Sequence, residues 1–221
     1  MARWVCLDVG ETIIDETRVW STWADELGIS RLTFMAALGA AIERGGDYRD
    51  VFEAVRRPDW RRHREGFERR YGGFHADDLY ADALPAIARL GERGYRVAIL
   101  ANQPASRTAE LRAIGVSGEV MAMSDELGVH KPSPDFFERT LGLLGSPDPA
   151  DVAYVGDRID NDVRPAAAAG MRAVWLRRGP WGVIPTDSPP EASLIVSSLT
   201  ELVERIDLCW PDEPGSAVSS R

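Results

Sequence analysis

The feature that most constrains this chain is the alternation of short apolar runs, rich in β-branched residues, with segments of helical spacing. Strands are expected at Trp4 to Leu7, Tyr95 to Leu100, Glu119 to Met123, Val152 to Val155 and Ala173 to Leu176. Helices are expected at Asp82 to Arg93, Ser106 to Ile114, Pro134 to Leu144 and Asp160 to Ala169. Because strands that alternate with helices pair in parallel, this pattern predicts an α/β fold, a doubly wound parallel sheet with helices on both faces.

The alternation stops between residues 15 and 79, where successive helices are expected instead. Apolar residues there follow helical spacing at Trp20, Trp23, Ala24, Leu27, Phe34, Leu38 and Ala41. Since this all-helical insertion directly follows the first strand, it should lie above the carboxyl ends of the strands, where ligands bind in such folds. We expect a catalytic core of residues 1–14 and 80–210, a small helical cap of residues 15–79, and a frayed tail of residues 211–221.

The charge balance argues against nucleic acid as a partner. The formal net charge is -9, whereas binding to a phosphate backbone usually requires a clustered excess of Lys and Arg. Residues 56–70 carry seven arginines mixed with Glu65 and Glu68. Because helical spacing brings these acids beside the bases, a solvated helix face is favoured over a substrate-facing anion patch.

Cysteine usage and hydropathy favour a cytoplasmic protein. The two cysteines, Cys6 in an apolar run and Cys209 near the tail, do not form a disulfide framework. No basic N-terminal region precedes an apolar stretch, and no segment approaches the length of a membrane span. We therefore expect no membrane partner; the sequence carries no pattern that fixes an oligomeric state.

Acidic residues follow two of the predicted strands. Asp8 comes directly after the first strand, and Gly156-Asp157 follows the fourth, with Asp160, Asn161 and Asp162 in the next turn. Neighbouring carboxylates repel unless a cation neutralises them, and hard oxygen ligands suit Mg²⁺. Each acid also has a simpler interpretation, Asp8 as a turn former and Asp160 or Asp162 as a helix N-terminal charge.

A single lysine marks the loop between these acids. Of the 26 Lys and Arg residues, only Lys131 is a lysine, and it stands in the loop Gly128-Val129-His130-Lys131-Pro132. Because a compact ammonium and a planar guanidinium are not interchangeable, its retention favours a functional role. That role would be to neutralise a nucleophilic carboxylate and a phosphoryl oxygen as a point charge.

Together these residues resemble the haloacid dehalogenase-like superfamily over the chain from Arg3 to about Arg178. Four motifs match in order, and they comprise Asp8 with Thr12, Asn102 after the second strand, Lys131, and Gly156-Asp157 with Asn161-Asp162. The resemblance implies a Rossmann-like core and a small phosphorylated substrate. It implies Asp8 as the nucleophile that forms an aspartyl-phosphate, Lys131 as its partner, and Thr12, Asn102 and Lys131 as substrate-binding residues. It also implies Mg²⁺ held by Asp8, the Gly10 carbonyl, Asp157 and Asp162.

Two positions depart from the family pattern. Gly10 replaces the second Asp, which protonates the leaving group and then activates water, and Ala101 replaces a Ser or Thr that would hold a phosphoryl oxygen. A positioned acid or base is typically worth about 10² to 10⁴ in rate. The sequence thus predicts poor turnover of alkyl phosphates. Glu11 and His130 are candidate replacements, although a surface glutamate and an exposed loop histidine are favoured for them.

Three functions remain open from the sequence. The first is a Mg²⁺-dependent phosphatase. The second is a 2-haloacid dehalogenase, because those relatives also lack the second Asp and use no metal; the retained Asp157 and Asp162 count against it. The third is a degenerate member that binds a phosphorylated ligand or a protein without turnover, which the loss of acid at Gly10 and of hydroxyl at Ala101 would explain.

Overall fold

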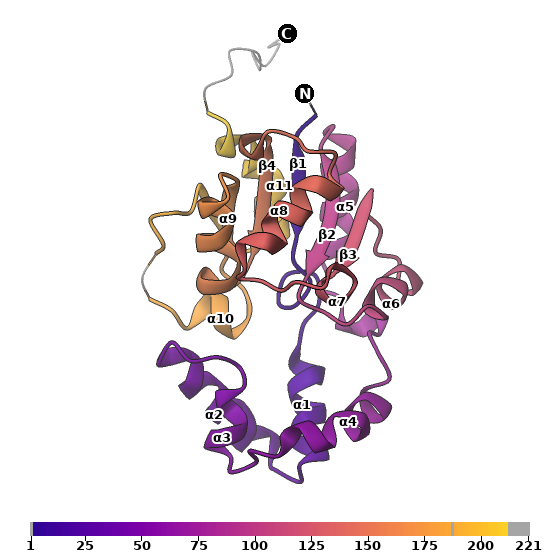
Figure 1. Ribbon diagram of the computed structural model, residues 1–221, viewed down its shortest axis with the longest axis vertical. Helices are drawn as coiled ribbons and strands as arrows, with labels where there is room; N and C mark the ends of the chain where they lie inside the picture. Colours follow the sequence, from indigo (N-terminus) through magenta and orange to yellow (C-terminus); the bar gives the residue numbers. More distant parts are fainter. Residues whose placement is uncertain (1, 187, 212–221) are drawn as a thin grey trace.

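Six parallel strands form the sheet at the centre of the molecule (Figure 1). The computed structural model describes residues 2–186 and 188–211. The strands are β1 (Trp4–Leu7), β2 (Arg96–Ala101), β3 (Val120–Met123), β4 (Val152–Gly156), β5 (Arg172–Leu176) and β6 (Leu194–Val196). Their spatial order is β3-β2-β1-β4-β5-β6, and every neighbouring pair is parallel. The predicted α/β fold is confirmed, and its strand order reverses between β1 and β4.

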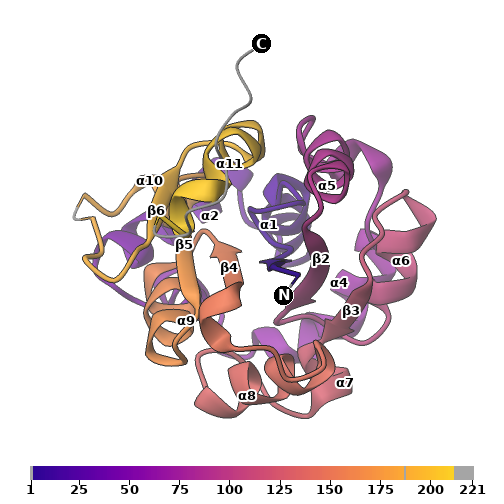
Figure 2. The same ribbon diagram turned by 90° about the horizontal axis from the view of Figure 1, so that it is seen from above.

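Helices cover both faces of this sheet (Figure 2). Alternate side chains of a strand point to opposite faces, so Leu7 and Cys6 of β1 belong to two different core clusters. The first face is covered by α5 (Ala83–Glu92) and α11 (Leu199–Arg205), and the second by α8 (Pro134–Leu143) and α9 (Arg164–Ala168). Both faces of the central strands are therefore buried, which explains their continuous apolar runs.

The remaining helices include a group that stands apart from the sheet. They are α1 (Thr17–Glu26), α2 (Arg31–Glu43), α3 (Asp50–Ala54), α4 (Arg64–Tyr71), α6 (Arg107–Ala113), α7 (Ser124–Leu127) and α10 (Gly179–Val183), with 3₁₀ turns at Trp60–His63, Ala76–Asp78, Pro149–Asp151 and Ile206–Cys209 and a π-helical turn at Ile159–Val163. Helices α1 to α4 gather beyond the carboxyl ends of the strands, drawn in purple in Figure 1. This is the place expected for the cap, whose boundaries at residues 15 and 79 stay a prediction.

Two neighbouring chain segments join α1 to α4 to the rest of the molecule. Ile14 and Leu79 form an antiparallel bridge, and the Tyr80 N–H donates to the Ile13 carbonyl at 3.0 Å. Within the group, the apolar positions from Trp20 to Ala41 that follow helical spacing are all buried, and Trp23 stacks on Phe67 with ring centroids 4.3 Å apart. These helices are thus held together by an aromatic core of their own.

Some expectations differ from the structure in detail. The three-residue strand β6 was not predicted, because so short a run carries no periodicity. The helix expected from Asp160 starts at Arg164 instead, after the π-helical turn. Six of the seven arginines of residues 56–70 are exposed, as a solvated face requires, and Arg57 is partly buried. Apart from Pro211, the predicted tail lies outside the described residues. Among residues 2–186 and 188–211, no helix has the length and apolar character needed to cross a membrane.

Candidate active site

Asp8 and Asp157 meet at the point where the strand order reverses. Each is the first residue after its strand, β1 and β4 respectively, and the Asp8 N–H donates to the Val155 carbonyl at 2.9 Å. Both side chains are largely buried, with 8% of Asp8 and 3% of Asp157 exposed. In open α/β sheets this crevice is where ligands bind, so both carboxylates lie at the position where a ligand site is expected.

Asp162 reaches the same place through the π-helical turn. The Arg158 carbonyl accepts N–H groups from both Asp162 and Val163, at 2.9 and 3.1 Å. This widened turn sends the Asp162 side chain back toward the strand end, where its Oδ2 accepts the Arg158 N–H at 3.0 Å. A Cβ on Gly156 would collide with the Asp162 carboxylate. Glycine at position 156 therefore allows Asp162 to approach the backbone this closely.

Lys131 bridges the first and last of these acids. Its Nζ lies 2.8 Å from Oδ1 of Asp8 and 2.5 Å from Oδ1 of Asp162, and 4% of the residue is exposed. Burial acts to lower the pKa of Lys131, but the charges of Asp162 and Asp8 outweigh it and raise that pKa well above its ordinary value. The ammonium therefore stays charged in the site.

The predicted substrate-binding residue Asn102 fixes the backbone of Lys131. Its Oδ1 accepts the Lys131 N–H at 2.8 Å, and its Nδ2 donates to the Lys131 carbonyl at 2.9 Å. Because both ends of the amide are used, Asn102 positions the lysine loop from the end of β2. It also lines the pocket described below, so a contact with substrate stays a prediction.

Three carboxylates come close enough to share one cation. Ligand oxygens of Asp8, Asp157 and Asp162 all lie within 4.8 Å of one another. Burial, reinforced by the charges of Asp162 and Asp8, raises the pKa of Asp157 well above its ordinary value, and burial raises the pKa of Asp162 to about 6 despite the Lys131 charge. Among the described residues Asp157 makes no ion pair. The cluster therefore holds more negative charge than Lys131 neutralises.

The loop after β1 differs from the expectation at Glu11. The prediction of a surface glutamate is wrong, because Glu11 is 4% exposed. Its carboxylate accepts hydrogen bonds from the Tyr80 hydroxyl and, at 3.1 Å, from the Glu16 N–H. Glu11 itself has the positive φ of 50° in this turn, whereas Gly10 does not lie in the left-handed region. The turn directs the Glu11 side chain into these contacts.

Thr12 is not brought to the pocket. Its side chain is fully buried, its Oγ1 has no hydrogen-bond partner among the described residues, and its carbonyl accepts from Arg178 Nη1 at 3.0 Å. Thr12 does not line the cavity above Asp8. The geometry thus indicates that Thr12 supports the loop after β1, and its contact with a substrate stays a prediction.

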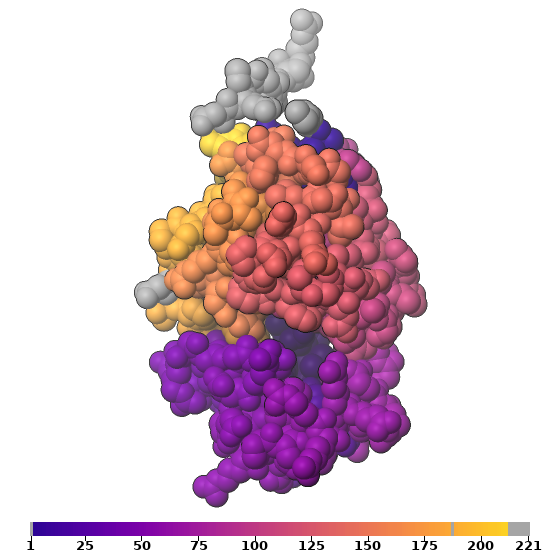
Figure 3. Space-filling model, viewed as in Figure 1, coloured from indigo at the N-terminus to yellow at the C-terminus, as the bar shows by residue number. Residues whose placement is uncertain are grey.

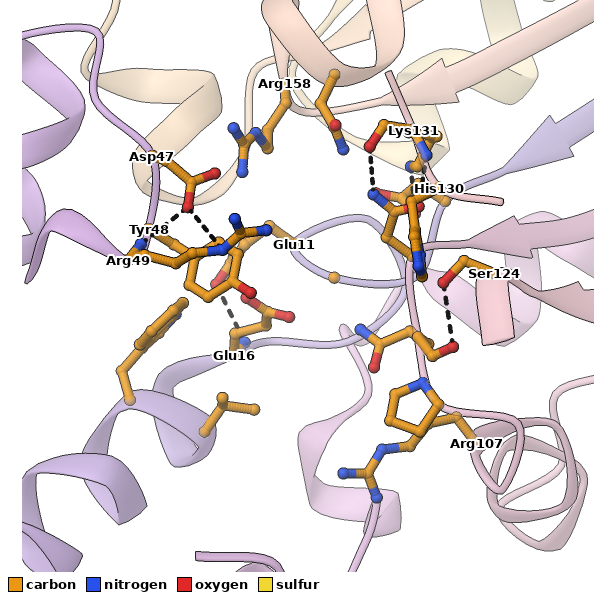
Figure 4. A pocket seen from close by; sticks show the side chains of 18 of the residues that line it. Glu11, Glu16, Asp47, Tyr48, Arg49, Arg107, Ser124, His130, Lys131 and Arg158 are labelled. Atoms are coloured by element: carbon orange, nitrogen blue, oxygen red, sulfur yellow. Dashed lines mark hydrogen bonds and ion pairs between the residues drawn. The ribbon is translucent and has the colours of Figure 1, made fainter. Parts of the chain in front are cut away.

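A cavity of about 830 Å³ lies between the sheet and helices α1 to α4. Figure 3 shows the hollow between these purple helices and the core. Asp8, Lys131 and Asp157 lie at its floor, and its walls carry the aromatic side chains of Trp20, Trp23, Tyr48, Phe52, Trp60, Phe67, Tyr71, Phe74 and Trp181. Trp20 and Trp23 therefore serve both the aromatic core and the pocket wall. Exposed His130 also lines it, beside Lys131 (Figure 4).

Sequence reasoning missed Glu16, which also lines this pocket (Figure 4). Burial, together with the charges of Glu11 and Asp8, raises the pKa of Glu16 to about 8. A Cβ added to Gly10 would lie 2.5 Å from Glu16 Oε1. The only sequence signal was a carboxylate six residues after Gly10, which does not show that the chain folds back on itself.

A family model described as haloacid dehalogenase-like hydrolase matches residues 2–170. The chain belongs to the haloacid dehalogenase-like hydrolases. This hydrolase is 35% identical over 103 residues to a glyceraldehyde 3-phosphate phosphatase of Methanopyrus kandleri, and the match covers 45% of the chain and 44% of the relative. It is 35% identical over 127 residues to a phosphoserine phosphatase of Thermus thermophilus, covering 56% and 49%. The chain thus spans about half the length of these relatives.

Solved structures share the fold over nearly the whole hydrolase. A HAD phosphatase from Thermococcus onnurineus has a TM-score of 0.61 at 25% identity, covering 92% of this chain and 97% of its own. The HAD-hydrolase YfnB from Bacillus subtilis, bound to magnesium, has a TM-score of 0.71 at 18% identity, covering 93% and 99%. The L-2-haloacid dehalogenase RSc1362 has a TM-score of 0.68 at 18% identity, with the same coverage. At 18% identity, the last two support the fold alone.

Proposed function

We propose that this hydrolase is a Mg²⁺-dependent phosphatase that acts on a small phosphorylated metabolite through an aspartyl-phosphate on Asp8. One observation carries the proposal. Asp8 lies at the strand-order reversal, 2.8 Å from the Lys131 ammonium and within 4.8 Å of the oxygens of Asp157 and Asp162. A nucleophilic carboxylate, a fixed cation beside it and a cluster of hard oxygen ligands are what phosphoryl transfer requires.

The residues present fit a divalent cation. If all three acids are ionised, Lys131 leaves two negative charges uncompensated in a buried cluster, which is costly without a further cation. Asp8, Asp157 and the Gly10 carbonyl would hold Mg²⁺, with Asp162 as a ligand through water or as support. When bound, the ion would neutralise charge on the transferring phosphoryl group. The retention of Asp157 and Asp162 is also the main argument against a metal-independent dehalogenase.

The chain's own groups have separable tasks in this reaction. An Asp8 oxygen attacks phosphorus, and the Lys131 ammonium holds that carboxylate in place and faces the charge that develops on the phosphoryl oxygens. Asn102 fixes the lysine loop through its two hydrogen bonds. Asp162 holds Lys131 from the other side at 2.5 Å. The nucleophile is thus positioned by a buried network that connects β1, the Lys131 loop and the turn after β4.

The pocket supports a small organic phosphate as the substrate class. Its volume of about 830 Å³ lies in the range of small-molecule sites, and its aromatic walls would contact the organic part of such a substrate. Arg49, Arg64 and Arg158 line it as well, and arginines recognise anionic groups. The two relatives are phosphatases named for glyceraldehyde 3-phosphate and for phosphoserine, which favours substrates of that size.

The test is a screen of phosphorylated metabolites and an aryl phosphate with Mg²⁺ or with EDTA. We expect phosphate release that needs Mg²⁺, is abolished in Asp8→Asn because an amide cannot attack phosphorus, and is unchanged in the matched control Asp59→Asn, an exposed position. Halide release from 2-haloacids that persists in EDTA would instead establish the dehalogenase. Binding of phosphate esters without turnover of any of them would establish the degenerate binding protein.

A further inference from the structure

The space beside Gly10 is occupied by the carboxylate of Glu16. A Cβ built on Gly10 would lie 2.5 Å from Glu16 Oε1 and 2.9 Å from its Cδ. By ordinary bond lengths and angles, an aspartate places its carboxylate oxygens about 2.4 Å from its own Cβ. Glu16 Oε1 therefore lies about as far from this Cβ as the carboxylate oxygen of an aspartate at position 10 would.

No ion pair holds Glu16 in this position among the described residues, although the Trp20 side chain and the charge of Arg158 act on its carboxylate. It stands at the N-cap position of α1, but its side chain makes no capping hydrogen bond. Its backbone N–H donates to Glu11 Oε1 at 3.1 Å, which fixes the main chain and does not involve the Glu16 carboxylate. Among the described residues Glu16 makes no ion pair. A partly buried carboxylate without a salt bridge thus faces the pocket that also contains Asp8.

Glu11 and His130, the two other candidates, are less suitable. The Glu11 carboxylate is engaged by the Tyr80 hydroxyl and the Glu16 N–H, so a proton transfer to substrate would break these contacts. His130 lies exposed in the loop that carries Lys131, and among the described residues its ring forms no hydrogen bond or ion pair that would hold it toward Asp8. Glu16 is the carboxylate placed beside the backbone of the missing acid.

We propose that Glu16 is the general acid and base of this enzyme and replaces the aspartate that is absent at position 10. The inference rests on the proposed phosphatase function. As an Asp8 oxygen bonds to phosphorus and the phosphorus–oxygen ester bond breaks, the leaving oxygen takes the proton of the Glu16 carboxylic acid and departs as an alcohol. The Glu16 carboxylate then takes a proton from water, whose oxygen attacks phosphorus as the Asp8–phosphorus bond breaks. Inorganic phosphate leaves, and both carboxyl groups return to their initial states.

The experiment compares an alkyl and an aryl phosphate in wild type, Glu16→Gln, Glu16→Ala and the double variant Gly10→Asp/Glu16→Ala. The matched control is Glu65→Gln, which is exposed on α4. Glutamine keeps the shape of Glu16 but cannot donate a carboxylic proton. We expect Glu16→Gln to lower kcat on the alkyl phosphate by about 10² to 10⁴. On the aryl phosphate, whose leaving group departs as an anion, phosphorylation of Asp8 in a single turnover should fall much less. The subsequent hydrolysis of the aspartyl-phosphate should slow for both substrates.

The double variant tests the placement of the acid. Removing the Glu16 side chain clears the space that a Cβ at position 10 needs, so the added aspartate should restore alkyl phosphate turnover relative to Glu16→Ala alone. Wild-type rates on both esters in Glu16→Gln would overturn the inference. An equal loss on both esters in the phosphorylation step of Glu16→Gln would also overturn it. A loss of Mg²⁺ affinity in Glu16→Gln, measured by calorimetry, would overturn it as well, because Glu16 would then be a metal ligand. If wild type turns over neither ester, the proposed function fails and this inference with it; aryl turnover without the selectivity defeats only the role of Glu16.

Discussion

The Nζ of Lys131 lies 2.5 Å from Oδ1 of Asp162, and both side chains are 1% exposed. The same Nζ contacts Asp8 at 2.8 Å. An ion pair buried to this extent is costly to form, and removing one partner leaves the other charge unpaired in a poorly solvated place. The lone lysine of the chain therefore affects both the stability of the site and the charge environment of Asp8, the proposed nucleophile.

Replacing Lys131 should remove most of the activity while the protein stays folded. Lys131→Ala leaves Asp8 and Asp162 without their cation, so we expect turnover to fall by about 10² or more and stability to drop by up to about 3 to 5 kcal/mol. Lys131→Arg should not rescue activity, because a planar guanidinium does not fit a site built for a compact ammonium. Steady-state rates and urea unfolding of both variants provide the measurement. An arginine variant with wild-type kcat would contradict this assignment.

Asp157 should be required for Mg²⁺ binding. We expect Asp157→Asn to weaken Mg²⁺ affinity at least tenfold in calorimetry, because an uncharged amide replaces one of three clustered carboxylates. Asp160→Asn is the matched control. Asp160 is exposed and turned toward Arg158, to which it is hydrogen-bonded, and it is not part of the cluster. Equal affinities of the two variants would place the metal elsewhere.

The raised pKa of Asp157 predicts how stability depends on pH without metal. The folded protein holds this proton more tightly than the unfolded chain, where the pKa is about 3.9. The contribution of Asp157 to stability is therefore greatest at low pH and is lost as the pH rises above about 4 through the folded pKa. Asparagine cannot ionise, so Asp157→Asn should be more stable than wild type at pH 7 in EDTA, with a smaller difference at pH 4.

Urea unfolding of both proteins from pH 4 to 8 measures that difference. Adding Mg²⁺ should reverse the order at pH 7, because wild type alone binds it well; a concentration of 100 times the Kd adds about 2.7 kcal/mol. A stability difference that is constant with pH would show that the charge of Asp157 is not the cause. Wild type that gains no stability from Mg²⁺ would contradict the metal site itself.

The sequence predicted the sheet and its acids because both depend on local patterns. Asp8 and Asp157 directly follow apolar runs, and parallel strands bring their carboxyl ends to one edge, so their meeting required no side-chain detail. The burial of Glu11 and the position of Glu16 could not be predicted, because neither follows from a local pattern. The burial of Glu11 depends on a positive φ and on Tyr80, 69 residues away in sequence. The approach of Glu16 to Gly10 depends on the turn between β1 and α1, which periodicity does not describe.

Asn102 provides a last test of how the site is positioned. Its amide forms two hydrogen bonds to the backbone of Lys131, so Asn102→Ala should free the loop and let the ammonium drift from Asp8. A misplacement of about 1 Å can cost about 10² in rate, so we expect kcat to fall by about 10 to 100. Because the three acids keep their positions, Mg²⁺ affinity should stay within about two- to threefold of wild type. Asn102→Asp keeps the acceptor for the Lys131 N–H but sets a carboxylate against its carbonyl, so it should recover little.

If Asn102 instead contacts substrate, Asn102→Ala should raise KM and leave single-turnover phosphorylation of Asp8 at saturating substrate unchanged. Rapid-quench measurement of that step separates the two, and a wild-type rate there would show that Asn102 does not act through Lys131.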